Sequence, residues 1–211
     1  MKRFWGVILC AFCISWTGIT ETLAQKVIHS IVKETRTEVE CTSMTQYVEK
    51  NTMEITVFDR EGEEDAAFVC FCDQFVSLES FSGEIFDIQG KRVRKIRKSD
   101  LQMSEYSSSL LTDDYRYYYL SKHPSFPYTI RYEWKVKCRD GVIGFPLFVP
   151  QVASGQPVVK ASYSIRIPAG QTCRYYARNI EGKKVSISEK TDESGWKQID
   201  VVASDLPPLY K

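Results

Sequence analysis

The chain has 211 residues, with 28 Lys and Arg against 27 Asp and Glu, so its formal net charge is only +1. This balance argues against a general nucleic-acid binder, which needs an excess of basic residues on one face. Hydrophobic residues make up 43% and aromatic residues 13% of the chain, which is typical of a packed globular core and not of a disordered protein. The length allows one large all-β domain or two small ones.

The first residues have the features of a secretory signal. Lys2 and Arg3 precede an apolar run at residues 4–19, and small residues come just before position 25. We predict that residues 1–24 are a signal peptide cleaved before Gln25, and that residues 25–211 form a single β-sandwich domain. The alternative is an uncleaved anchor, but a run of about 16 residues is short for a membrane span of roughly 20. We therefore expect an exported protein of the periplasm or outer cell envelope, with no stable membrane span after cleavage.

The first half of the predicted domain is a series of strands. Alternating polar and apolar residues at 35–50 and 53–57 predict two strands, separated by a turn at Lys50 and Asn51. Residues 25–33 predict a loosely tied first strand. Residues 67–72 predict a buried strand, although their length alone does not exclude a helical turn.

A hairpin is predicted next, with strands at residues 84–87 and 92–97 and a tight turn between them. Its return strand carries a run of basic residues, namely Lys91, Arg92, Arg94, Lys95, Arg97 and Lys98. Such a run can mark a nucleic-acid or membrane patch, but the acidic residues close by favour a solvated strand face. The serine-rich residues 99–112 lack periodicity and predict a loop.

Three tyrosines form a row on the next predicted strand. Tyr115, Tyr117 and Tyr119 share one face, and we name them as candidate ligand-binding residues because such a row can stack on sugar rings or a peptide. The alternative is that the rings pack in a sandwich core and their hydroxyls reach its rim. We favour packing, because tyrosine is often partly buried.

The strongest alternation lies between residues 126 and 168. Residues 128–137 and 158–167 each present an apolar face and a polar face, and a turn follows at residues 139–141. Pro146 and Pro150 interrupt the segment between them, which predicts an edge strand or an extended cover. We expect the three pieces to form an antiparallel meander. Weaker alternation at residues 173–179, 185–188 and 196–202 completes an all-β, antiparallel sandwich of roughly ten or more strands.

Five cysteines remain after residue 24: Cys41, Cys70, Cys72, Cys138 and Cys173. An odd number in an exported protein implies a free thiol or an intermolecular bond. Cys70 and Cys72 share a strand face, but a metal site needs more ligands than this pair and two histidines offer. We therefore predict no metal and no cofactor. We expect the cysteines to be buried as small hydrophobic residues, and the sequence does not decide whether two of them form a disulfide. A Cys nucleophile with His29 or His123 as its base is the enzymatic alternative.

Several short motifs, in this order and spacing, resemble those of domain of unknown function 3857, an exported bacterial domain often found ahead of a transglutaminase-like core. The motifs are residues 84–87 with Gly90 and Lys91, residues 98–101, 113–116 and 127–130 with Tyr132 and Trp134, residues 148–151, and Val158 with Ser162 and Tyr163. The resemblance runs from about residue 35 to residue 209. It implies a β-sandwich-like domain of the cell envelope with no settled activity. It also implies a following core with a Cys, His and Asp triad, whereas this sequence ends at Lys211, as a stand-alone or a truncated copy would.

These observations favour an exported, non-catalytic module that binds an unknown peptide, glycan or envelope protein, and no nucleic acid. We name no catalytic residue, because function has to be argued from a site and no catalytic site is visible. The alternative is the N-terminal part of a transglutaminase-like cysteine peptidase or transferase whose catalytic core is missing from this chain.

Overall fold

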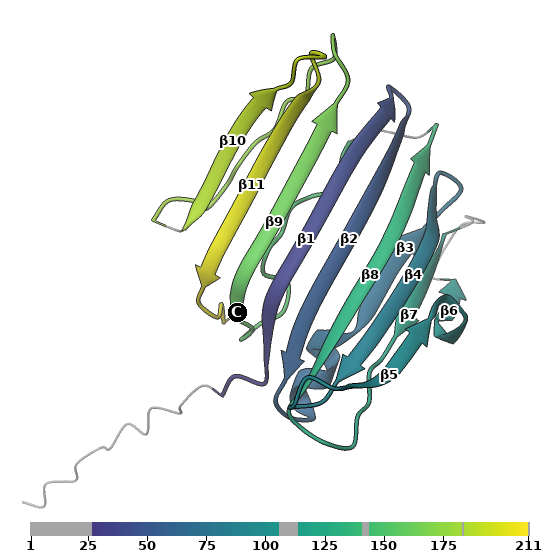
Figure 1. The fold of residues 1–211 in the computed structure, drawn as a ribbon, viewed down its shortest axis with the longest axis vertical. Helices are drawn as coiled ribbons and strands as arrows, with labels where there is room; N and C mark the ends of the chain where they lie inside the picture. The colour runs from purple at the N-terminus through teal and green to yellow at the C-terminus, as the bar shows by residue number, and fades with distance from the viewer. Residues whose placement is uncertain (1–26, 106–113, 141–143, 183, 211) are drawn as a thin grey trace, which may run out of the picture.

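The computed structural model describes residues 27–105, 114–140, 144–182 and 184–210 and contains two β-sheets (Figure 1). The larger sheet has eight strands in the order β10-β11-β9-β1-β2-β8-β4-β5, and the smaller has three in the order β3-β7-β6. The strands are β1 (Ser30–Ser43), β2 (Gln46–Val57), β3 (Phe68–Cys72), β4 (Val76–Phe86), β5 (Arg92–Arg97), β6 (Gln102–Glu105), β7 (Tyr115–Tyr119), β8 (Tyr128–Arg139), β9 (Val158–Ile167), β10 (Val185–Thr191) and β11 (Lys197–Leu206). Two short 3₁₀ helices, η1 (Glu61–Ala66) and η2 (Lys98–Asp100), join strands.

The all-β prediction is confirmed, but the large sheet is mixed. β1 runs parallel to β9, and every other strand pair of the described residues is antiparallel. The meander expected between residues 126 and 168 is therefore wrong, because β1 and β2 lie between β8 and β9. β8 and β9 run in the same direction, because β8 and β1 are both antiparallel to β2 and β1 is parallel to β9. Strands of one sheet that run in the same direction need a connection of about a dozen or more residues, and residues 140–157 provide one.

Alternation along the strands decides which face of the large sheet is buried. On β8, Tyr128, Ile130 and Tyr132 are buried and point inward, while Arg131 and Glu133 between them are exposed. Neighbouring strands continue this face in register, because Ile55 of β2 lies opposite Ile130. Figure 1 shows β3, β7 and β6 behind β8, β4 and β5, so the small sheet covers one end of this buried face.

Two hydrophobic clusters fill the buried face. The first lies under the small sheet, where the ring of Phe68 contacts Phe81, Tyr132 and Trp134 with centroids 4.5, 5.6 and 5.4 Å away. The second lies around Val39, Cys41, Tyr47 and Ile165, and the irregular segments between β8 and β10 cover it with Phe145, Phe148 and Cys173. β1, β2 and β8 contribute side chains to both clusters.

Some element boundaries differ from those predicted. The first long strand turns at residues 44–45, and Asn51 lies buried inside β2, so the turn expected at Lys50 and Asn51 is wrong. Part of the predicted serine-rich loop is β6, and residues 173–179 form no strand. The strand at 67–72 is confirmed as β3, and the predicted hairpin is confirmed as β4 and β5, where Gly90 N–H donates to the Asp87 carbonyl over 2.9 Å.

The predicted signal peptide lies outside the described residues. Within them, no helix has the length and apolar character that crossing a membrane requires.

Candidate functional site

The tyrosine row on β7 faces the large sheet. Tyr119 is buried, and Tyr115 and Tyr117 pack against the first hydrophobic cluster. The guanidinium of Arg94 lies 5.8 Å from the centre of the Tyr119 ring, and the ammonium of Lys98 lies 5.6 Å from that of Tyr117. The rings therefore have the packing role that we favoured, and ligand binding by them stays a prediction.

The buried thiols of β3 form a pair. The sulfur atoms of Cys70 and Cys72 are 4.0 Å apart, and Tyr117 and Tyr115 lie opposite them on β7. The hydrogen bond between the two sulfur atoms lowers the pKa of Cys72 and raises the pKa of Cys70. No disulfide joins any of the five described cysteines, and burial raises the pKa of Cys41 to about 11, which makes that thiol inert.

The two histidines bind groups other than thiols. His29 contacts Asp59 and Glu61 through its two ring nitrogens at 2.8 and 3.1 Å. The Nδ1 atom of His123 lies 2.9 Å from the Ser125 carbonyl oxygen, and its ring packs at a tilt against Tyr128. Within the described part of the chain, none of these imidazole contacts is with a cysteine. Among the described residues no group of three or more His, Cys, Asp and Glu side chains is placed to hold a metal ion.

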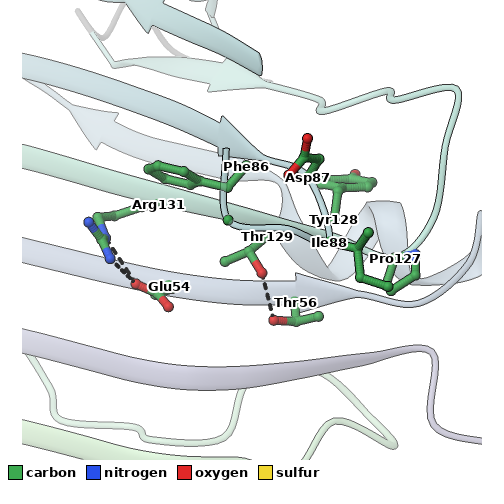
Figure 2. Close-up of a pocket in the computed structure, with 10 residues that line it drawn as sticks. Glu54, Thr56, Phe86, Asp87, Ile88, Pro127, Tyr128, Thr129 and Arg131 are labelled. Atoms are coloured by element: carbon green, nitrogen blue, oxygen red, sulfur yellow. Dashed lines mark hydrogen bonds and ion pairs between the residues drawn. The ribbon is translucent and has the colours of Figure 1, made fainter. Parts of the chain in front are cut away.

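The outer face of the large sheet is the candidate binding surface. It presents the polar side of β1, β2, β8 and β4 to solvent, and it is hollowed in two places. The first hollow, of about 360 Å³, lies where β2 ends, β8 begins and β4 turns into β5 (Figure 2). This volume falls within the range of about 300–1,000 Å³ that is usual for small-ligand sites.

Side chains from three strands meet in the first hollow. Arg131 of β8 donates to Glu54 of β2 from Nε and Nη2 at 2.9 and 2.6 Å, and its guanidinium lies 5.4 Å from the centre of the Phe86 ring on β4. The hydroxyls of Thr56 and Thr129 are 2.9 Å apart on the floor (Figure 2). The hollow therefore combines a charged pair, two hydroxyls and an aromatic ring.

The second hollow, of about 500 Å³, continues along the same strands. It is lined by charges of both signs and by two serines of β4, namely Arg36, Glu38, Lys50, Glu133, Lys135, Ser80 and Ser82. Because β2 and β8 line both hollows, the outer face offers a polar strip along these two strands.

The charged groups of this face are suited to binding. A hydrogen bond to Glu54 raises the pKa of Arg131 above its ordinary value, and a hydrogen bond from Lys135 lowers the pKa of Glu79 below its own. Both shifts keep the groups charged over a wide pH range. A general acid or base needs instead a pKa close to the working pH, so these two groups fit charge-assisted binding better than proton transfer.

Sequence reasoning placed Arg131, Glu133 and Lys135 on a charged strand face but did not name them as site residues. Alternation shows which residues share a face, whereas the partners of Arg131 lie 77 residues before it and on a third strand. The hollow could have been predicted only from the strand order, in which β8 lies between β2 and β4.

The fold is similar to that of a longer protein. A crystal structure of a "putative protease" from Parabacteroides distasonis matches with a TM-score of 0.70 and 15% identity, covering 87% of this chain and 37% of that one. An M1 zinc metallopeptidase from Deinococcus radiodurans reaches a TM-score of only 0.34 at 7% identity, covering 83% of this chain and 42% of that one. This chain thus spans well under half the length of either protein.

No curated protein matches the chain significantly. A family model does match, over residues 44–210, and its description is a domain of unknown function with a solved structure. This range includes most of the described strands and both hollows of the outer face, apart from the β1 side chains. The resemblance seen in the sequence is therefore confirmed, and the chain belongs to the family of domain of unknown function 3857 (DUF3857).

Proposed function

We propose that this chain is an exported, non-catalytic module of the bacterial cell envelope, and that it binds a peptide, glycan or protein partner on the outer face of its large sheet. The observation that supports this most directly is the first hollow, where a fixed guanidinium–carboxylate pair, two hydroxyls and an aromatic ring converge on a surface open to solvent. A few fixed polar groups beside apolar surface are the usual composition of a recognition site.

The non-catalytic part of the proposal is supported by the arrangement of the reactive residues. The thiol pair of β3 is buried, and the imidazoles are hydrogen-bonded to carboxylates and backbone. A nucleophilic thiol needs an adjacent base, oriented by a third group, to be activated. The protein should therefore leave peptide and glycan mixtures unchanged when products are sought by mass spectrometry. Turnover that is lost in Cys72→Ser would overturn this part.

A matched pair of variants tests the binding face. Thr129→Arg fills the first hollow, whereas Ser188→Arg introduces the same side chain on β10, away from both hollows. We expect Thr129→Arg to weaken binding to ligands from a peptide and glycan array by about tenfold or more, and Ser188→Arg to leave it unchanged. The proposal fails if no ligand on the array binds, or if both variants bind as the unchanged protein does.

A second candidate function is the non-catalytic part of a longer transglutaminase-like peptidase or transferase. The Parabacteroides protein bears the name of a protease, which supports the peptidase alternative, and this chain matches only 37% of that protein. The intact mass of the native protein from an envelope fraction separates the two candidates. A mass equal to residues 25–211 supports the stand-alone exported module, and a much larger mass supports the second candidate.

A further inference from the structure

The edge of the large sheet formed by β5 has a free side. β5 ends the strand order and pairs only with β4 within the described part of the chain (Figure 1). An edge strand of this kind carries backbone N–H and C=O groups that a further strand can pair with. On β5 the N–H of Arg97 is not one of them, because it donates to the Asp100 carboxylate at 2.7 Å. Of its six residues, only Ile96 is buried, so the side chains along this edge are open to solvent.

This edge is also strongly basic. From Lys91 to Lys98, every residue except Val93 and Ile96 is Lys or Arg. One of these cations, Arg92, forms an ion pair, with Glu84 at 2.7 Å. Among the described residues, no carboxylate lies within ion-pair distance of Arg94, Lys95 or Arg97.

The cations of β5 point to both sides of the sheet. Lys95 and Arg97 lie opposite Glu84 and Ser82 of β4 on the outer face, whereas Arg94 lies over the Tyr119 ring on the inner side. An extended partner that adds to this edge would also direct alternate side chains to the two faces. Acidic side chains on either face of such a partner would therefore meet a cation.

We propose that β5 is a docking edge for an extended acidic segment of a partner protein, which adds to the large sheet as its ninth strand. Backbone hydrogen bonds would provide the affinity, and the cations would select acidic sequences. The same cations disfavour edge-to-edge pairing of two copies of this chain, since like charges would then face each other. This edge is distinct from the hollows of the outer face, and either proposal can fail without the other.

Fluorescence anisotropy with short labelled peptides tests the proposal on the full chain. The probe is an extended peptide with alternating Glu and Val, compared with a Lys and Val version and with a Glu and Val version whose backbone is N-methylated at alternate residues. We expect only the unmodified acidic peptide to bind, and to bind more weakly when salt rises from about 0.05 to 0.5 M, because exposed charges are screened.

Variants place the binding on β5. Lys95→Glu with Arg97→Glu should weaken binding of the acidic peptide at least about tenfold. The control is Lys190→Glu with Lys197→Glu, which reverses two cations on β10 and β11 at the opposite end of the sheet. Circular dichroism checks that both pairs of variants remain folded.

Three results would overturn the proposal. The first is the absence of binding by the acidic peptide. The second is equal binding of the N-methylated peptide or of a DNA oligonucleotide, which would show a charged patch without strand addition. The third is equal loss of binding in both pairs of variants, which would place the peptide elsewhere or show an effect of net charge alone.

Discussion

At the scale of single residues, Gly62 allows η1 to pack against the start of β1. A Cβ atom at this position would overlap the backbone carbonyl oxygen and carbon of His29, and these backbone atoms cannot move aside as a flexible side chain would. The same carbonyl accepts a hydrogen bond from the N–H of Phe58 at 2.9 Å, so it is tied to the end of β2 as well.

Gly62→Ala should therefore destabilise the protein by about 2–4 kcal/mol, because overpacking a site that cannot relax costs free energy. Gly144→Ala is the control, since a Cβ there would meet no atom within 4 Å. It should change the free energy of unfolding by less than about 0.5 kcal/mol. Chemical denaturation measures the free energy of unfolding of both variants, and an equal change in the two would show that the close contact at Gly62 is not destabilising.

The ion pairs of His29 make stability depend on pH. The hydrogen bond to Asp59 raises the pKa of His29 above 6.5, so the folded state binds a proton more tightly than the unfolded state does. The stabilisation is then fully present below pH 6.5 and is lost as the pH rises through the pKa of the folded state.

We expect His29→Gln to lower the melting temperature more at about pH 5.5 than at about pH 8.5, for this reason. His123→Gln, which removes an imidazole that packs against Tyr128 and has no ion pair within the described residues, is the control. Thermal melts at both pH values decide the matter. If His29→Gln lowered the melting temperature equally at both pH values, the substitution would have removed only packing.

At the scale of the strand, β7 separates a buried side from an exposed one. Tyr119 is buried and lies opposite Phe68, while Arg116 and Tyr118 point away from the large sheet, with the Arg116 guanidinium 5.8 Å from the centre of the Tyr118 ring. This strand is also where the two interpretations of the tyrosine row predict different results.

Tyr119→Ala should cost about 3–5 kcal/mol, as truncation of a buried aromatic side chain usually does. Tyr118→Ala should cost less than about 1 kcal/mol, because its ring lies on the exposed side. Urea denaturation measures both variants. If Tyr119→Ala instead abolished binding of a glycan and left stability unchanged, the row would be a ligand site and the packing interpretation would be wrong.

Strands were predictable from the sequence where their two faces differ strongly. β8 and β9 alternate cleanly because one side packs on the core and the other faces water, and the prediction for β9 matches its bounds. The turn between β1 and β2 was missed, because the polar residues around Met44 continue the pattern of the strands without a Gly or Pro. β6 was missed because it is short and almost fully exposed.

Strand order was not predictable, since alternation contains no information on which strands pair. The parallel pairing of β1 with β9 joins residues more than 120 positions apart, such as Val32 and Val158. The first hollow depends on the order β2-β8-β4, because Arg131 of β8 contacts Glu54 on one neighbouring strand and Phe86 on the other. The alternation of β8 thus placed Arg131 on a polar strand face, and the contacts that make this face a candidate site came from the structure.

At the scale of the whole molecule, the large sheet joins the two hydrophobic clusters into one structure. β1 contributes Val32 to the first cluster and Val39 to the second, and β2 likewise contributes Ile55 and Tyr47. Separating the clusters would require these strands to break in the middle, where their backbones are paired on both sides. We therefore expect both clusters to unfold in one cooperative transition.

The cysteines report on this prediction without any substitution. Cys70 and Cys72 are buried in the first cluster, and Cys41 and Cys138 in the second. In pulsed alkylation at increasing guanidinium concentration, read by peptide mass spectrometry, both pairs should become reactive at the same midpoint, because none of these four thiols is exposed before the sheet opens. Cys173, which is only partly buried, should react earlier. Two separate midpoints would show that the halves of the sheet unfold independently, and the cover between β8 and β10 would then belong to a second folding unit.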